Sequence, residues 1–452
     1  MRKILLAVLA AISLAGGEAV CAQESTPLPS APAPQTSVAP QPASAGTPLK
    51  LTVKDAESLA LKNNPAISIA RLNALISHEA VRETRSALLP AATVSLTGVD
   101  ANEGSRIGAG GLNNPVLYDR AAAGSTLSQL ITDFGRSTNL LASSRLHAKA
   151  EDENAIATAQ QISLAADQAF YTALESYAVL KVADQTVASR QLAADRIQAL
   201  TKAKLKSDLD LSFANVNLSE AKLLQLEERN NYNAALASLS SILGFPNVQN
   251  LELIEEGTNG EPPPASVDSL IQSALKQRPD LNSLQYSLES AQKFRNAEHE
   301  LVRPTISALG TVGSVPFNTG HLESWYGAVG VNISIPVFNG FLFNARAHEA
   351  DLRAEAADRR RVDLANRISR DVRIAWLDST RAYHRLDVTR QLLDQARMAQ
   401  DLAQTRYNLG LGSIVEYSQA ELQATQAEIA NTTARYEYAF ALKRLQFETG
   451  NR

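Results

Sequence analysis

The sequence predicts a mainly α-helical, internally duplicated chain that also carries strands able to cross a membrane. Three observations point to this fold class. The chain repeats itself at an offset of 206 to 214 residues, long stretches lack both Gly and Pro, and two segments in each half alternate apolar with small or polar residues. Aromatic residues make up only 5% of the 452 residues, which is typical of long helices with thin, small-residue seams.

The first 22 residues have the features of a secretory signal peptide. A positively charged start is followed by an apolar stretch from Ile4 to Leu14, and small residues then offer a cleavage site after residue 22. Cys21, the only cysteine, would be removed with this segment. The alternative is lipidation of Cys21, but the residues just before it do not match a lipoprotein signal. Residues 23–50 are rich in Pro and Ala and are expected to form a disordered leader.

The body of the chain is predicted to consist of two repeats, at 51–244 and 265–452, joined by a Gly/Pro-rich connector at 245–264. The segment Ala60–Pro65 recurs as Ala274–Pro279. Further along, the offset becomes 206, and the residues that match include Tyr177 with Tyr383, Ser207 with Ser413, and Gly244 with Gly450.

Each repeat is predicted to contain a helix, two strands, a very long helix, a turn and a last helix. The long helices are expected at 136–203 and 341–408, because few breakers interrupt them. Small and aliphatic residues follow 3-4 spacing from Ala159 to Val187 and from Ala365 to Leu393, which predicts closely packed seams. The shorter helices are expected at 54–87, 208–243, 266–301 and 413–448.

Two membrane strands are predicted at about 91–132 and two more at about 304–337. Each is about 10–12 residues long, enough to cross a bilayer at a tilt. Trp325 and Phe338 flank the last strand, as aromatic residues do at membrane interfaces. A half-buried soluble sheet would alternate similarly. Four strands are too few to close a membrane barrel, so other chains would have to complete it, and three copies would supply about 12.

Composition and residue spacing exclude several classes of protein. The net charge of −4 and pI near 6.0 argue against nucleic-acid binding. No apolar run beyond the signal peptide is long enough for a membrane helix. The six histidines are scattered and have no cysteine nearby, so we expect no metal site, no cofactor and no catalytic residues.

Together these features resemble the TolC-like outer membrane efflux protein family, the outer-membrane factors of tripartite efflux and type I secretion systems. The resemblance implies a homotrimer in which a 12-stranded outer-membrane β-barrel, with four strands per chain, continues into a periplasmic α-helical barrel. The motifs that carry it are Asn64-Pro65, Leu88-Leu89-Pro90, Pro336–Gly340 and, most specifically, Arg406–Gly412.

The resemblance also implies a function without enzymatic activity. Members export drugs, small molecules or proteins through the outer membrane. They act with a periplasmic membrane-fusion adaptor and an inner-membrane pump of the RND, ABC or MFS class.

Two acidic residues, Asp210 and Glu416, are candidates for a periplasmic gate that also selects ions. In the family, the hairpin turns converge at the periplasmic end, where acidic side chains form rings in the trimer. Gln419 stands where the family can have a further aspartate. The alternative is that both acids only stabilise the starts of their helices.

The turn Leu409-Gly410-Leu411 is the candidate adaptor-docking site. Glycine permits a tight turn or a close approach there, although Gly410 could instead serve only to end the long helix. The corresponding turn of the first repeat, Lys202–Asp208, lacks a glycine. Whether both turns bind an adaptor in the same way is therefore left open.

Two other functions fit parts of the sequence. A trimeric coiled-coil surface adhesin would explain the long helices, but adhesins usually place their membrane strands in one C-terminal block. A periplasmic adaptor of an efflux pump also has long helical hairpins, but it lacks membrane strands. Here strands are predicted in both repeats, which favours the export channel.

Overall fold

The computed structural model describes residues 49–100, 120–255, 262–318 and 323–451. The predicted signal peptide at 1–22, almost all of the 23–50 leader and part of the connector lie outside the described residues. The chain divides into two compact units. Unit 1 contains Ser77–Leu146 and Glu289–Glu355, and unit 2 contains the other described residues.

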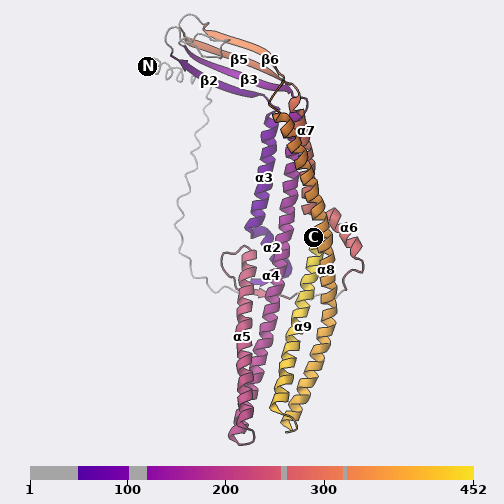
Figure 1. The fold of residues 1–452 in the computed structure, drawn as a ribbon. Coiled ribbons are helices and arrows are strands. Elements are labelled where there is room, and N and C mark those ends of the chain that lie inside the picture. Colours follow the sequence, from indigo (N-terminus) through magenta and orange to yellow (C-terminus); the bar gives the residue numbers. More distant parts are fainter. Residues whose placement is uncertain (1–48, 101–119, 256–261, 319–322, 452) are drawn as a thin grey trace. The chain divides into compact units, whose positions relative to one another are not determined.

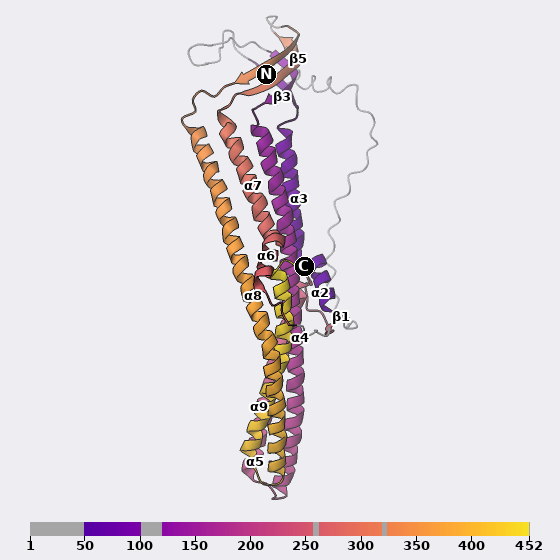
Figure 2. The same ribbon diagram turned by 90° about the vertical axis from the view of Figure 1, so that its right-hand side faces the viewer.

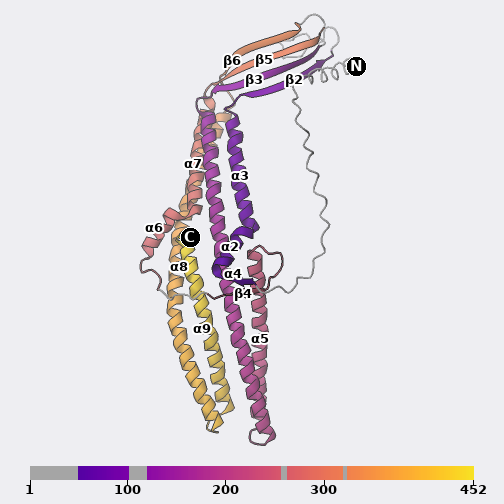
Figure 3. The same ribbon diagram turned by 180° about the vertical axis from the view of Figure 1, so that it is seen from behind.

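A four-stranded antiparallel sheet is the main feature of unit 1 (Figure 1; Figure 3 shows it from behind). Its strands lie in the order β2-β3-β5-β6, so each repeat contributes one hairpin, as predicted. The centre of the sheet is the pairing of β3 with β5, and β2 and β6 are its edges. The bounds are β2 Ala91–Val99, β3 Arg120–Thr132, β5 Thr305–Asn318 and β6 Trp325–Ser334.

The sheet exposes apolar side chains, and one of its tyrosines covers two of its glycines. Val329 on β6 is 91% exposed, and its alternating neighbours Val331 and Ile333 are exposed as well. Tyr326 lies across Gly124 and Gly313, at which any added Cβ would clash with the tyrosine ring. The glycines therefore leave room for an aromatic side chain that covers three strands.

The helical part of unit 1 is joined by buried polar contacts. Helix α7 (Pro279–His299) contacts α4 (Arg136–Lys202) through a hydrogen bond between the hydroxyls of Ser290 and Ser143, 3.0 Å apart. On α8 (Leu342–Asn408), Arg346 donates two hydrogen bonds of 2.7 and 3.0 Å to the buried carboxylate of Glu298. A bidentate pair of this kind fixes the relative position of the two helices.

Unit 2 contains most of two long helical hairpins, α4 with α5 (Asp208–Ile242) and α8 with α9 (Ile414–Glu448) (Figure 2). The first residues of α4 and α8 belong to unit 1. These four helices match the predicted ranges to within one residue at each end. No residue of either predicted 3-4 seam is exposed. The seam residues with at most 1% exposure are Ala166, Ala173, Ala183, Ile368, Val372, Ala375 and Ser379.

The predicted single helices at 54–87 and 266–301 are wrong, because each breaks before a proline. Asn64 and Arg278 have extended backbones, with ψ of 124° and 122°. Proline has no N–H and disfavours helical geometry in the residue before it. The resulting helices are α2 Val53–Asn63, α3 Pro65–Ser86, α6 Val267–Gln277 and α7, which is followed by a short 3₁₀ turn at Glu300–Val302.

A two-stranded parallel sheet in unit 2 was not predicted. Strand β1 (Leu49–Leu51) pairs with β4 (Leu251–Leu253), which lies in the connector between the repeats. Leu51 and Leu251 are buried in the same apolar cluster as Phe170 of α4. With three residues each, these strands are too short for alternation to reveal them.

The residue before each helix-breaking proline binds the end of a hairpin helix. Asn64 donates a 2.9 Å hydrogen bond to the carbonyl of Ile242 at the end of α5. Arg278 forms a 2.5 Å ion pair with Glu448 at the end of α9. Unpaired carbonyls at a helix end need such partners when they are buried.

The residues that follow these two helix ends are glycines with left-handed backbones. Gly244 has a φ of +80°, and a Cβ there would lie 2.7 Å from the carbonyl oxygen of Asn63. Gly450, its counterpart in the second repeat, has a φ of +75° and approaches Gln277. Each hairpin therefore packs its end closely against a helix junction, and at Gly244 the distance is one that only glycine allows.

We predict that Gly244→Ala destabilises the protein more than Gly410→Ala does. Both alanines would adopt a strained left-handed backbone, at about 1–2 kcal/mol, but an added Cβ at Gly410 meets nothing within 4 Å. The Gly244 variant also has to separate α5 from α2. Thermal unfolding of the solubilised protein, followed by far-UV circular dichroism, measures both losses, and equal losses would contradict the close approach at Gly244.

Candidate functional site

The two hairpin turns have the same backbone although their sequences differ. Lys204 and Gly410 both have left-handed conformations, with φ of 58° and 75°. In each turn the same two hydrogen bonds close the helix, as in the Schellman motif. They run from Lys204 N to Thr201 O (2.9 Å) and Leu205 N to Leu200 O (2.9 Å), and from Gly410 N to Tyr407 O (3.1 Å) and Leu411 N to Arg406 O (2.8 Å). The first turn thus reaches this backbone without a glycine.

Both turns present leucine side chains to solvent. Leu205 is 71% exposed in the first turn, and its counterpart Leu411 is 70% exposed in the second. Leu409 is exposed as well, so the predicted docking residues Leu409, Gly410 and Leu411 lie together at the surface. Gly410 ends α8 in a left-handed conformation, the role that its alternative interpretation assigned to it.

Asp210 takes part in the start of α5. The Ser207 hydroxyl oxygen accepts a hydrogen bond from the Asp210 N–H (3.1 Å), and Asp210 Oδ2 accepts from the N–H (3.1 Å) and the hydroxyl (2.9 Å) of Ser207. This reciprocal arrangement is a capping box. The structure therefore gives Asp210 a helix-capping role, whatever its part in transport.

Glu416 occupies the equivalent place at the start of α9 but uses its carboxylate differently. Its N–H donates to the Ser413 hydroxyl (3.1 Å), while its Oε1 lies 3.2 Å from Nε of Arg406. Arg406 belongs to the last turn of α8, so the ion pair links the two sides of the second hairpin. The Arg406 charge offsets that of Glu416.

The first turn carries more positive than negative charge. Lys202, Lys204 and Lys206 outnumber Asp208 and Asp210, which leaves a formal charge of +1 over this segment. An attraction of cations to the hairpin ends therefore requires the acids to lie nearer to the ion path than the lysines do.

A buried arginine, which was not predicted, joins the two hairpins within unit 2. Arg190 on α4 is 5% exposed and donates a 2.8 Å hydrogen bond to the carbonyl of Asn217 on α5. Its Nε lies 3.8 Å from Oε2 of Glu421 on α9, which is 4% exposed. Beside this pair, the Asn217 amide donates a 2.6 Å hydrogen bond to the hydroxyl of Ser418 on α9.

Burial changes the ionisation of the groups around Arg190. Desolvation raises the pKa of the Glu421 carboxyl, and the neighbouring Arg190 charge opposes that rise. Desolvation, with a further contribution from the Glu421 charge, raises the pKa of Tyr417 to about 12. The phenol thus stays protonated, and the charge that counters the burial of the Glu421 carboxylate is that of Arg190, 3.8 Å away.

A comparison of the repeats could have found these residues from the sequence. At the offset of 206, Arg190 corresponds to Ala396, and Glu421 corresponds to Asn215. A charged residue on a small-residue seam whose counterpart in the other repeat is alanine indicates a contact that only one copy makes. The duplication was detected from residues that are identical in the two repeats, and such residues do not reveal a position at which the repeats differ.

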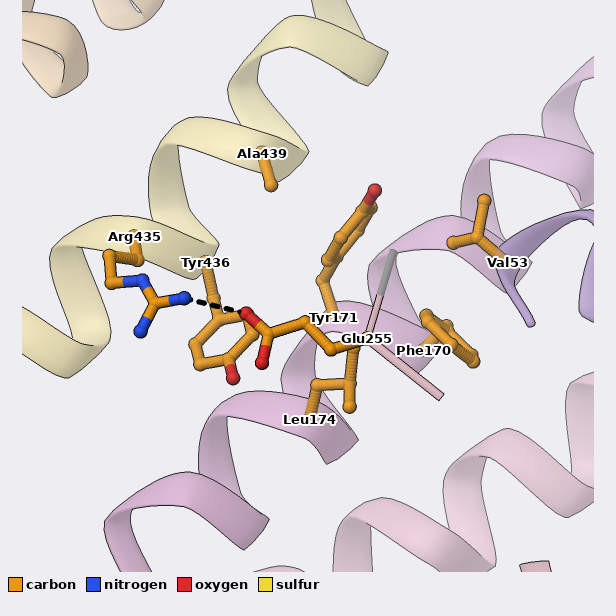
Figure 4. Close-up of a pocket in the computed structure, with 8 residues that line it drawn as sticks. All are labelled: Val53, Phe170, Tyr171, Leu174, Glu255, Arg435, Tyr436 and Ala439. Atoms are coloured by element: carbon orange, nitrogen blue, oxygen red, sulfur yellow. Dashed lines mark hydrogen bonds and ion pairs between the residues drawn. The ribbon is translucent and has the colours of Figure 1, made fainter. Parts of the chain in front are cut away.

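Glu255 of the connector contacts the hairpins beside a small cavity (Figure 4). Arg435 donates a 2.8 Å hydrogen bond to Glu255, and the Tyr436 phenol beside them has a pKa raised to about 12, chiefly by burial. The cavity measures about 10 Å³, roughly the space of one water molecule. It is a packing gap and not a ligand site.

Within the described part of the chain, no three His, Cys, Asp or Glu side chains are grouped as a metal site would require. None of the described helices combines the length and apolar character of a membrane-spanning helix.

Comparisons with known proteins identify the family. The model of the family described as "outer membrane efflux protein" matches residues 57–245 and 270–451. No curated protein sequence matches the chain significantly. The chain belongs to the outer membrane efflux protein family.

Solved structures share the fold at low sequence identity. A membrane protein from Pseudomonas aeruginosa has 20% identity and a TM-score of 0.78, over 88% of this chain and 93% of that chain. CusC has 19% identity and a TM-score of 0.77, over 88% and 92% of the two chains. The CmeC outer membrane channel from Campylobacter jejuni has 19% identity and a TM-score of 0.76, over 88% and 85%.

These findings confirm the predicted family and fold class: the chain is mainly helical, contains the long-helix hairpin twice, and has the fold of solved outer-membrane channels. The chain is an outer-membrane efflux channel with a periplasmic helical part, and it is not an enzyme. The matches to channels across both repeats disfavour the adhesin and adaptor alternatives.

We predict that Arg190→Met destabilises the protein by about 3 kcal/mol or more, because it leaves the buried Glu421 carboxylate without its counter-charge. Adding Glu421→Gln should recover part of this loss, since the neutral amide needs no partner cation. Thermal unfolding of the parent, the single variants and the double variant measures the coupling. Additive losses would show that the two side chains do not interact.

The pH dependence of the same variants gives a second measurement. Because the pKa of Glu421 is raised above its ordinary value of 4.5 in the folded protein, the folded state holds a proton that the unfolded chain has lost. The contribution of Glu421 to stability therefore falls as pH rises from 4.5 through the raised value. Glu421→Gln should flatten this fall, and an unchanged pH profile would contradict it.

Proposed function

We propose that this chain forms the outer-membrane duct of a tripartite export system. Cargo, either drugs, other small molecules or proteins, enters at the hairpin ends and leaves outside the cell. The observation that carries the proposal is the pair of equivalent turns that expose Leu205 and Leu411 at the ends of the two hairpins. Solved structures with a similar fold support it, since CmeC and Neisseria gonorrhoeae MtrE are both outer membrane channels.

The turns suit a periplasmic membrane-fusion adaptor as the docking partner. An exposed leucine next to a helix end presents apolar surface to water, and a partner protein could bury this side chain as an anchor. Because the two turns of each chain have the same backbone conformation and each exposes a leucine, a trimer would offer six such anchors. The adaptor in turn connects the duct to an inner-membrane pump of the RND, ABC or MFS class, which supplies the energy.

Leu411→Asp should abolish export while leaving the trimer intact, because a charge in the apolar contact would have to be desolvated on docking. The test is a strain that lacks the gene and is complemented with parent or variant. Its readouts are the accumulation of a fluorescent pump substrate and the set of secreted proteins.

Leu223→Asp is the matched control, since Leu223 is as exposed as Leu411 but lies in the middle of α5. Leu205→Asp tests the first turn, and we expect it to impair export as Leu411→Asp does. Normal export by the Leu411 variant would exclude this turn from docking.

Asp210 and Glu416 form the proposed periplasmic gate. In a trimer each acid occurs three times, so up to six carboxylates can surround one constriction and attract cations. The ion pair of Glu416 with Arg406 weakens its share. Among the described residues, Asp210 forms no ion pair and its carboxylate accepts hydrogen bonds from Ser207 alone, so Asp210 contributes more of the negative potential.

The double variant Asp210→Asn with Glu416→Gln should lower the cation preference of single trimers in a planar bilayer. Asparagine still accepts the hydrogen bonds of the capping box, so the charge is lost while the helix start is kept. Asp210→Asn alone should have the larger effect of the two single variants.

Glu227→Gln with Asp363→Asn is the control, because it removes the same charge from residues of α5 and α8 that lie many helical turns from the hairpin ends. A reversal potential that stays at the parent value in the gate variant would mean that both acids only stabilise their helices.

A further inference from the structure

A second cavity in unit 2 lies beside the hairpin ends and is large enough for a small molecule. It measures about 170 Å³ and is open to solvent. Its walls come from α4, from the first turn, from the end of α8 and from the start of α9. For comparison, a protein cavity of about 150 Å³ can hold benzene.

The charged side chains that line this cavity are both cationic. Arg196 extends from α4, and Lys206 from the first turn, and no carboxylate belongs to the lining. Two acids outside the lining act on its tyrosines: Asp210, whose carboxylate already accepts two hydrogen bonds from Ser207, and Glu421, which lies beside Arg190. A ligand in this cavity therefore meets a positive potential.

Tyr407 supplies a buried polar group without a partner. The residue is 7% exposed and lines the cavity, and its hydroxyl has no hydrogen-bond partner among the described residues. Burial, together with the Asp210 charge, raises the pKa of this phenol, so at neutral pH it is protonated and able to donate. A buried hydroxyl with nothing to bond is costly, and a ligand acceptor would remove that cost.

Aromatic rings and aliphatic side chains line part of the rest of the cavity, beside the polar Ser189, Gln404 and Asn408. Tyr407 stacks on Tyr417, with ring centroids 5.8 Å apart and planes 8° from parallel. Lys206 Nζ lies 3.7 Å from the Tyr407 ring centroid, which holds the ammonium at the cavity wall. Leu192 and Ile197 of α4 complete the lining on the other side.

We propose that this cavity binds a small organic anion that has an apolar body, such as one ring, and one carboxylate. The carboxylate pairs with Arg196 and Lys206 and accepts from the Tyr407 hydroxyl, while the ring packs between the tyrosines and the aliphatic wall of α4.

The experiment titrates the full-length trimer in lipid nanodiscs with benzoate, followed by ligand-observed saturation-transfer NMR, with empty nanodiscs as the blank. We expect saturable binding of one benzoate per chain and at least about tenfold weaker binding of benzamide, which has the same shape without the charge. Absence of saturable binding, or equal binding of benzamide, would overturn the proposal.

Variants locate the site on the molecule. Arg196→Gln and Lys206→Gln should each weaken benzoate binding about tenfold, and Tyr407→Phe several-fold. Lys202→Gln is the control, because Lys202 lies in the last turn of α4 but does not line the cavity. Circular dichroism and trimer size confirm that each variant is folded. Parent-like binding by Arg196→Gln, or an equal loss in Lys202→Gln, would place any benzoate elsewhere.

Discussion

The left-handed residue that follows each hairpin helix is the constraint on which the rest of unit 2 depends. It is Lys204, Gly244, Gly410 or Gly450, and each amide bonds back to the helix it ends. A long helix leaves four carbonyls without partners, and this reversal satisfies part of them while it turns the chain. At the turns between the two helices of each hairpin, the left-handed residue reverses the chain, so that the second helix packs against the small-residue seam of the first. At the other ends it brings the helix against a proline junction, which sets how far each hairpin can extend.

The sequence predicted the elements that repeat and are long. Uninterrupted helices and 3-4 seams are collective signals, so the ranges of α4, α5, α8 and α9 followed from them. Pro65 and Pro279 were visible too, but the prediction continued a helix through each, against the restriction that proline places on its predecessor. The β1–β4 pair was too short to detect. The left-handed Lys204 was unexpected because the turn's hydrogen bonds, and not the residue type, impose its backbone.

The residues of the candidate site also fall into two groups, those that match between the repeats and those that differ. Residues that match between the repeats, such as Ser207 with Ser413, build the turns and could be found from the sequence. Residues that differ build the contacts between the hairpins, where Arg190 faces Glu421 and where Tyr407 has a threonine as its counterpart. In a duplicated chain the two copies meet each other only once, so the polar groups at that junction need not obey the repeat. Specific chemistry therefore concentrates where the internal symmetry fails.

The sheet of unit 1 extends the argument to the assembly. Strands β2 and β6 are its edges, and β6 exposes both of its faces along its whole length. Unpaired backbone groups in lipid cost several kcal/mol each, so a single chain has no stable membrane form. Because the four strands alternate in direction, β6 of one copy runs antiparallel to β2 of the next, and identical copies can join without a mismatched pair. Folding of the sheet is thus inseparable from association.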